Sequence, residues 1–268
     1  MKSALTGADI AFYQANGYLI FRQAVPANLI TDLRRTAAKA IEVARRLHGP
    51  QAQRLAELNQ LDAGDVTAVR AFSELPELNV AIQALLTPRH RISGVQDTSL
   101  LFEPAEGCWA MEWHRDWRDH MSAENFGKVF AEGWETLAAD PRLFNQINCA
   151  LYEDPCTWFV PGSHRRLQDT PGEIRAVKAA DSAALANKRR ERTEAEQEIL
   201  LDDYCRGMPG AVPLRLQAGD LAIYRSIAWH TGSYVPYRKR ATLHCSATTP
   251  EYEQFWKRAK TILANGGG

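Results

Sequence analysis

The sequence has no long apolar run, no excess of charge of either sign and no regular cysteine spacing. No stretch approaches the roughly 18 apolar residues that a membrane-spanning helix requires, and the first residues lack the apolar segment of a signal peptide. The 32 basic and 32 acidic residues cancel, whereas nucleic-acid and anionic-membrane partners usually demand a basic excess. We therefore expect a soluble, cytoplasmic protein that binds neither nucleic acid nor membrane.

The cysteines are odd in number and show no C-x-x-C pair; they are Cys108, Cys149, Cys156, Cys205 and Cys245. Such scatter predicts reduced thiols instead of a disulfide frame or a zinc site. Internal repeats are absent, and low complexity is confined to the terminal glycines. With 268 residues, 45% of them hydrophobic, the chain is long enough to bury a core, and we expect one domain over residues 1–268.

The first 90 residues carry helix signals. Thr6 with Asp9 resembles a capping box and Gly17 stands where a helix would end, so a helix is expected over 7–16. An apolar strand over 18–21 follows, and after Pro26 the apolar residues recur close to every 3.6 positions, which is typical of a longer helix. We expect residues 1–90 to form a helical support layer.

From Arg91 the pattern changes to short strands separated by turns. The expected strands are 92–102, 110–116, 146–152, 157–160, 213–216, 221–229 and 240–248. This order predicts a mostly β protein with flanking helices, in which a double-sheet jelly roll over 91–248 precedes a C-terminal helix over 249–268. Two stretches, 118–145 and 165–203, interrupt the pattern as inserts. They are either lids over a site or solvated surface segments.

The candidate chemistry begins with His114 and Asp116 at the end of an expected strand. Residues i and i+2 of a strand share a face, so both side chains can reach one ion. His230 closes the expected strand 221–229 and supplies a second imidazole. Two histidines and one carboxylate form the facial triad of non-haem iron oxygenases, which leaves coordination positions open for a bidentate oxo acid and O₂.

A second pattern follows His230. Side chains alternate between the two faces of a strand, so the polar residues of the expected strand 240–248 share one face; they are Arg240, Thr242, His244 and Ser246. Such a face lines a wet cavity, in which a guanidinium can clamp a carboxylate through two hydrogen bonds, or it belongs to an edge strand facing solvent. The spacing alone leaves both interpretations open.

Several motifs together resemble the phytanoyl-CoA dioxygenase family, which includes ectoine hydroxylase and other small-molecule hydroxylases. The resemblance covers most of the chain. It rests on the H-x-D pair and on these further segments: 16–19 (Asn-Gly-Tyr-Leu), 95–98 (Val-Gln-Asp-Thr), 160–164 (Val-Pro-Gly-Ser-His), 218–220 (Ala-Gly-Asp), His230 and Arg240.

The resemblance implies a double-stranded β-helix, or cupin-like jelly roll, that uses Fe(II), 2-oxoglutarate and O₂. It implies His114, Asp116 and His230 as the iron ligands and catalytic centre, and Arg240 as the partner of the distal carboxylate of 2-oxoglutarate. Thr98 and Gln96 are implied as strand positions bordering the cosubstrate. The expected reaction is hydroxylation, or another oxidation, of a C–H bond in a small molecule, amino acid or secondary metabolite, with release of succinate and CO₂.

Three departures from the family pattern concern the cosubstrate. The arginine stands ten residues after His230 where the family usually has eleven, which leaves Arg238 as a competitor to Arg240. Gly232 occupies a position that is often serine, and the turn over 153–156 is short. Two other functions stay open: a 2-oxoglutarate-independent, cupin-like metalloenzyme, and a catalytically silent binding protein on the same fold.

Overall fold

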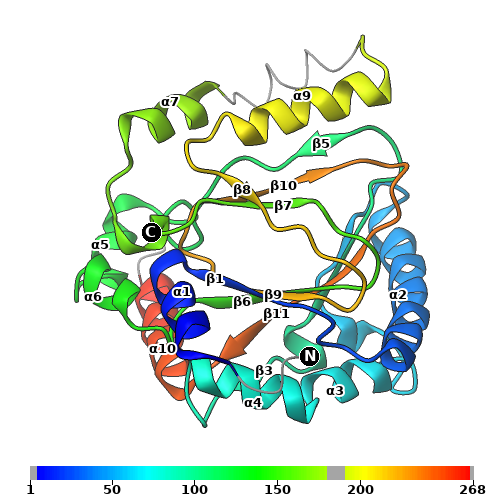
Figure 1. The fold of residues 1–268 in the computed structure, drawn as a ribbon, viewed down its shortest axis with the longest axis horizontal. Helices are drawn as coiled ribbons and strands as arrows, with labels where there is room; N and C mark the ends of the chain where they lie inside the picture. The colour runs from blue at the N-terminus through cyan, green and yellow to red at the C-terminus, as the bar shows by residue number, and fades with distance from the viewer. Residues whose placement is uncertain (1–4, 180–190, 266–268) are drawn as a thin grey trace.

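The computed structural model describes residues 5–179 and 191–265, and it contains two antiparallel β-sheets with helices outside them (Figure 1). The larger sheet has the strand order β1 (Tyr18–Phe21), β9 (Leu221–Arg225), β6 (Asn145–Ala150), β11 (Ala241–Thr248), β4 (Ser99–Phe102) and β2 (Arg54–Leu55), and β3 (Arg91–Ile92) also pairs with β11. The smaller sheet has the order β5 (Trp109–Ala110), β10 (His230–Tyr234), β7 (Thr157–Phe159) and β8 (Val212–Pro213).

From β4 onward the chain passes back and forth between the two sheets, and among the described strands only β7 and β8 are consecutive strands of the same sheet. Strands β4, β6, β9 and β11 belong to the large sheet, whereas β5, β7, β8 and β10 belong to the small one. Side chains on the inner face of each sheet therefore point into a shared interior. In β11, Leu243 and Cys245 enter the main hydrophobic core, and His244 between them lines a cavity. The alternation expected for this strand is confirmed, with the polar face toward a cavity.

The N-terminal helices cover the outer face of the large sheet and are α1 (Gly7–Asn16), α2 (Ala27–His48), α3 (Thr67–Ser73) and α4 (Pro76–Leu85) (Figure 1). The capping box and left-handed Gly17 predicted for α1 are both present. Leu33 and Ala40 of α2 share one apolar core with Ile147 of β6, so burial of apolar surface holds this layer in place. The layer is not purely helical, because β1 and the unexpected β2 extend the large sheet.

The remaining helices lie in two groups. One comprises α5 (Ala123–Val129), α6 (Trp134–Ala139) and the C-terminal α10 (Pro250–Asn265), which share an aromatic cluster. The other comprises α7 (Pro171–Ala179) and α9 (Glu194–Arg206) on the side of the small sheet (Figure 1). The inserts thus contain helices, although residues 180–190 of the second insert, and 266–268 of the expected C-terminal helix, lie outside the described residues. Short 3₁₀ turns occur at Leu58–Gln60, Val95–Asp97 and Ser163–Arg165.

Several strand predictions were wrong in their bounds. The strand expected over 110–116 is reduced to β5 and an isolated bridge at His114. The strand expected over 92–102 is divided, because Val95–Asp97 form a 3₁₀ turn between β3 and β4. The strand expected over 221–229 ends at Arg225, where a turn is closed by a hydrogen bond from the Ala228 amide to the Arg225 carbonyl. His230 therefore begins β10 of the small sheet and does not end a strand of the large one.

All five cysteines are buried, and none forms a disulfide bond within the described residues, in line with the reduced thiols expected from the sequence. Among the described residues, no helix is both long and apolar enough to cross a bilayer.

Candidate metal centre and cosubstrate cavity

His114, Asp116 and His230 lie together between the sheets. Their ligand atoms all fall within 4.8 Å of one another. Asp116 Oδ1 is 3.6 Å from His114 Nε2 and 3.9 Å from His230 Nε2. Ligand atoms that share one octahedral ion at metal–ligand distances of about 2.1 Å lie about 3 Å apart. The three side chains are therefore close to the spacing that a bound ion requires, without rearrangement of the backbone.

Backbone pairing explains how residues 114 and 230 meet. The His114 amide donates to the His230 carbonyl at 3.1 Å, and the His230 amide donates to the His114 carbonyl at 3.0 Å. Directly opposed antiparallel residues place their side chains on the same face, and the two imidazole centroids are 4.3 Å apart. This pairing between β10 and the segment after β5 is invisible in the sequence.

Asp116 reaches the same point by a turn, so the expectation of simple strand parity was incomplete. Only His114 forms a bridge, and the Asp116 amide donates to the Ser226 carbonyl at 3.0 Å. Trp117 then adopts a left-handed φ of 70°, an uncommon conformation for a large side chain. Such conformations persist where the surrounding structure holds them, and they cluster at functional sites.

Aromatic packing holds this turn. Trp117 contacts Phe144, which also has a positive φ, and both rings pack against Phe255 of α10 with centroids 5.0 Å away. Phe144 directly precedes β6, and Trp117 directly follows Asp116. The C-terminal helix therefore supports both segments that position the Asp116 carboxylate.

Both histidines present the same nitrogen to the centre. His114 Nδ1 lies 2.8 Å from the Glu112 carbonyl and His230 Nδ1 lies 2.9 Å from the Ala228 carbonyl. Because a carbonyl only accepts hydrogen bonds, each Nδ1 carries a proton, and each Nε2 faces the centre beside Asp116 as the nitrogen that can reach an ion. Such a contact on the far nitrogen is the usual way in which metal-binding imidazoles are oriented.

The charge state of the centre also suits a cation. Burial, followed by the nearby His230, lowers the pKa of His114 to about 4, so this imidazole is neutral at pH 7. Burial alone would raise the pKa of Asp116, but the His120 hydrogen bond and the two other histidines bring it well below its usual range. The site thus offers a neutral His114 imidazole and an ionised Asp116 carboxylate to a cation.

Gln146 of β6 holds the other oxygen of the carboxylate. Its Nε2 donates to Asp116 Oδ2 at 2.6 Å, which leaves Oδ1 facing the two histidines. Gln146 and Asn148 share the inner face of β6, whereas Ile147 and Cys149 enter the core. The sequence analysis missed this pair, although the alternation of polar and apolar residues over 145–150 is the signal that identifies it.

We predict that Gln146→Ala weakens divalent metal binding by about 10- to 100-fold, the usual loss when a residue that orients a ligand is removed. Titration with Co(II) under anaerobic conditions measures the affinity directly. Gln217→Ala serves as the control, because Gln217 is exposed in a turn and does not line the cavity. Equal metal affinity in the two variants would show that the Gln146 hydrogen bond does not orient Asp116.

A third histidine, His120, lies next to the triad and lines the same cavity. Its Nε2 is 3.5 Å from Asp116 Oδ1, and its side chain is more than half exposed. The hydrogen bond to Asp116 raises the pKa of His120 above its ordinary value. His120 lies outside the tight group formed by the other three residues.

The triad opens into a cavity of about 640 Å³ that Arg240 also lines. The Arg240 side chain is buried, and its Nε donates to Asp154 Oδ2 at 3.0 Å. Thr242 donates to the same oxygen, and the Cys156 amide donates to Asp154 Oδ1. Asp154 thereby fixes the guanidinium from its Nε side within the cavity wall. Nothing in the sequence singles out Asp154 for this contact.

Arg238 points elsewhere. Its Nη2 pairs with Glu198 of α9 at 2.8 Å, and both residues border a separate surface hollow. Between the two arginines left open by the sequence, Arg240 is the one that shares a cavity with the triad.

Thr98 and Gln96 do not border this cavity, and the strand parity expected for them is absent. Gln96 is exposed within the Val95–Asp97 3₁₀ turn. The Thr98 hydroxyl is buried and donates to the Gly94 carbonyl at 2.8 Å, which closes that turn. Neither residue is among the described residues that line the cavity. The physical reason is the turn itself, because it redirects both side chains before β4 begins.

Gly232, the second departure from the family pattern, is explained by Tyr234. A Cβ atom at Gly232 would lie 2.0 Å from the Tyr234 hydroxyl. The Tyr234 ring stacks at 4.5 Å on Trp109, and the Arg240 guanidinium lies 4.7 Å from its centroid. The tyrosine thus occupies the space that a side chain at position 232 would need.

We predict that Gly232→Ser destabilises the protein by about 1–3 kcal/mol, because overpacking forces neighbouring groups to shift. Tyr234→Ala in the same chain should remove most of this penalty, so urea unfolding of both single variants and the double variant forms a mutant cycle. Gly64→Ser is the control, since no atom lies within 4 Å of a Cβ there. A penalty independent of Tyr234 would contradict the steric explanation.

Comparison with known protein families assigns the chain to a family. The model of the family described as "Phytanoyl-CoA dioxygenase (PhyH)" matches residues 13–234. The chain belongs to the phytanoyl-CoA dioxygenase family. The resemblance inferred from the motifs is therefore confirmed. No curated protein sequence matches this family member.

Solved structures share the fold of this phytanoyl-CoA dioxygenase family member at low identity. AviO1 from Streptomyces viridochromogenes Tue57 has a TM-score of 0.56 at 15% identity, covering 91% of this chain and 95% of its own. HygX from Streptomyces hygroscopicus, solved with nickel and 2-oxoglutarate bound, has a TM-score of 0.56 at 13% identity and coverages of 92% and 88%. EctD from S. alaskensis, solved with 2-oxoglutarate and 5-hydroxyectoine, has a TM-score of 0.56 at 14% identity and coverages of 94% and 79%.

Proposed function

We propose that this protein is an Fe(II)- and 2-oxoglutarate-dependent dioxygenase that hydroxylates a C–H bond of a small molecule. His114, Asp116 and His230 hold the iron, and Arg240 binds the distal carboxylate of 2-oxoglutarate. One observation carries the proposal: the triad and a buried arginine line the same cavity. Family membership and neighbours solved with iron or nickel and 2-oxoglutarate support it.

The residues fit a ferrous ion. Two imidazole nitrogens and one carboxylate oxygen on one side of an octahedron are the donor set that non-haem Fe(II) oxygenases use. The hydrogen bonds on the far nitrogens and on the second carboxylate oxygen orient all three ligands before any ion arrives. When bound, Fe(II) and 2-oxoglutarate supply the oxidising chemistry with O₂, and succinate and CO₂ are released.

The chain's own residues position the reactants. The Nε contact to Asp154 leaves the outer end of the Arg240 guanidinium for a carboxylate, which such a fork can bind through two hydrogen bonds. Trp109 and Tyr234 form an aromatic wall beside it. Because Arg240 is buried in the cavity wall, its electrostatic contact with a bound carboxylate is stronger than it would be in bulk water.

We propose hydroxylation as the reaction, although proteins with similar structures catalyse other reactions. Neighbours are described as an epimerase and a carbocyclase of nogalamycin biosynthesis. A carboxylate at Asp116 occupies the coordination position that a halide would need, which favours hydroxylation over halogenation. We further propose that the strands form a double-stranded β-helix, that residues 1–268 are a single cytoplasmic domain, and that the partner is a small-molecule substrate.

Anaerobic titration with Fe(II) and 2-oxoglutarate tests the proposal. We expect the weak visible charge-transfer band of a chelated oxo acid, followed by succinate release in air with a suitable substrate. Metal binding without the band, and turnover that does not need 2-oxoglutarate, would favour the cupin-like metalloenzyme. Absence of any Fe(II) affinity would favour a silent binding protein.

A further inference from the structure

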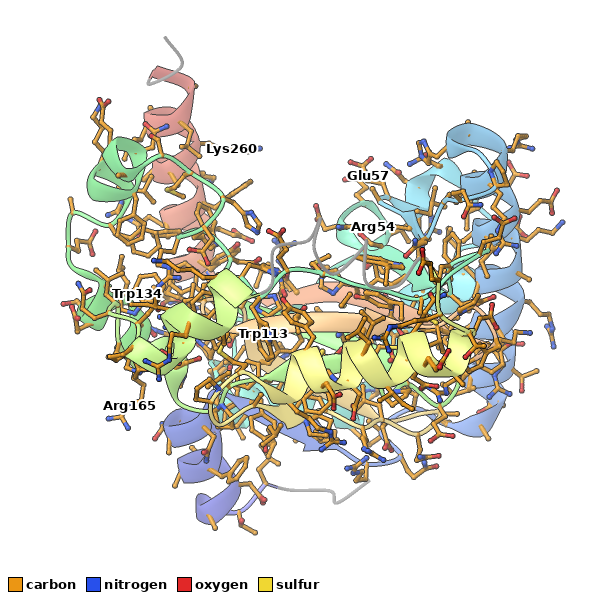
Figure 2. All side chains as sticks on the ribbon, turned by 90° about the horizontal axis from the view of Figure 1, so that it is seen from above. Arg54, Glu57, Trp113, Trp134, Arg165 and Lys260 are labelled. Carbon is orange, nitrogen blue, oxygen red and sulfur yellow. The ribbon has the colours of Figure 1, made fainter. Side chains whose placement is uncertain are left out.

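The cavity around the triad extends beyond Arg240 to a second wall. This wall comes from the end of α2, the loop after it and strands β2 and β4, and consists of His48, Gln51, Ala52, Gln53, Arg54, Leu101 and Phe102. Figure 2 shows Arg54 beside the α2 side of the molecule and Trp113 near the middle. A volume of about 640 Å³ is within the range of sites for whole small ligands. The second wall is therefore available to a primary substrate.

Arg54 is held in place on this wall. Its Nε and Nη2 donate to the Ser99 hydroxyl at 3.3 and 2.9 Å, and Ser99 itself donates to the Ala56 carbonyl at 2.7 Å. Ser99 is buried in β4, and β2 pairs with β4 so that Arg54 lies opposite Leu101. The guanidinium is thus fixed along one edge by a neutral hydroxyl.

Unlike the other ionised groups that line the cavity, Arg54 has no oppositely charged partner among the described residues. Arg240 is paired with Asp154, and Asp116 is engaged by Gln146 and the histidines. Within residues 5–179 and 191–265, Arg54 forms no salt bridge. Burial, and then the positive charge of Arg54, lower the pKa of His244 to about 4, so the field of this guanidinium reaches the cavity interior.

Two amide oxygens on the cavity wall also lack a partner. Gln53 Oε1 and Gln146 Oε1 are buried and accept no hydrogen bond from the described residues. Buried acceptors without a donor cost free energy unless a ligand supplies one. Gln53 and Arg54 both line this wall, which therefore carries an unfilled acceptor and an exposed cation that forms no salt bridge with the described residues.

We propose that Arg54 binds the carboxylate of the primary substrate, and that this substrate is a small polar carboxylic acid, such as an amino acid or a hydroxy acid. Its N–H or O–H groups satisfy the free amide oxygens of Gln53 and Gln146. The inference rests on the proposed function and adds the class of substrate.

The test compares wild type with Arg54→Ala and Arg54→Lys. Each protein is loaded with Fe(II) and 2-oxoglutarate without O₂, and melting temperatures are measured with the twenty protein L-amino acids, lactate and malate, each against its amide. Acids that raise the melting temperature are then assayed for succinate release. We expect responses from acids and not from their amides. Affinity for a responding acid should fall at least tenfold in Arg54→Ala and less in Arg54→Lys.

Arg46→Ala is the matched control, because Arg46 is an exposed arginine of α2 outside the cavity lining, and it should behave as wild type. The affinity for 2-oxoglutarate should stay within about twofold in Arg54→Ala, and a larger loss would assign Arg54 to the cosubstrate and overturn the inference. Equal response to acids and amides, no response from any acid, or a response to glycerol 3-phosphate alone would also overturn it.

The two failures remain distinct. If wild type shows no charge-transfer band with Fe(II) and 2-oxoglutarate, the proposed function fails. The comparison of acids with amides measures melting temperature and needs neither turnover nor a bound cosubstrate, so it still decides whether Arg54 binds a carboxylate.

Discussion

Replacing His230 by alanine is expected to abolish Fe(II) binding and 2-oxoglutarate-dependent succinate release. Loss of a residue that merely orients a ligand lowers metal affinity by about 10- to 100-fold, so loss of a ligand should cost about 10³-fold or more. The geometry adds a second reason, because His230 and His114 are opposed partners whose Nε2 atoms both face Asp116 Oδ1. Removing one imidazole leaves only two donors.

Equilibrium dialysis with Fe(II), and the visible band formed with 2-oxoglutarate, measure this loss separately from turnover. His120→Ala is the matched control. It removes an imidazole equally close to Asp116 Oδ1, yet one that is largely exposed and outside the tight group of ligand atoms. We expect this control to keep the band. If His120→Ala lost the band while His230→Ala retained it, the assignment of the three ligands would be wrong.

Replacing Arg240 should weaken 2-oxoglutarate binding by about 10²-fold or more, with metal affinity unchanged. Truncating one partner of a buried charge pair costs about 2–5 kcal/mol, and 1.36 kcal/mol corresponds to a factor of ten. Arg240 is buried beside the triad, and no other arginine that is buried lines this cavity among the described residues. Calorimetric titration of the Co(II)-loaded protein with 2-oxoglutarate measures the effect without turnover.

A simple alanine at position 240 would strand the buried Asp154 carboxylate and destabilise the fold, since uncompensated buried charge is costly. Arg240→Met combined with Asp154→Asn avoids this problem, because the amide oxygen can still accept from the Cys156 amide while the amide NH₂ donates to the Thr242 hydroxyl. Arg238→Ala is the control and should bind 2-oxoglutarate normally. The reverse result, with Arg238→Ala impaired and the double variant unaffected, would transfer the cosubstrate to Arg238.

The candidate metal centre depends on packing between residues that are far apart in the sequence. Asp116 is set by a left-handed Trp117, by Gln146 on β6 and by Phe255 on α10. Because protein interiors are close-packed, a small change in the packing of these residues is transmitted to the position of Asp116. The C-terminal helix is therefore part of the support of the site and more than a cap on the fold.

The sequence by itself determined the features that depend on local chemistry and on periodicity. The capping box before α1, the alternation along β11 and the state of the cysteines follow from neighbouring residues, and the structure confirms each of them. The motifs around His114, Asp116 and His230 were sufficient to indicate the family. Their role as metal ligands stays a prediction, and the experiments above test it.

Only the tertiary structure decided how distant residues meet. Which of Arg240 and Arg238 shares a cavity with the triad, the position of Thr98 and Gln96 outside that cavity, and the contacts of Asp154 and Arg54 all depend on segments dozens of residues apart. Strand parity fails where a 3₁₀ turn or a left-handed residue interrupts the strand, as at Val95–Asp97 and Trp117. Periodicity describes an uninterrupted element, whereas a binding site is built where elements end and strands from two sheets converge.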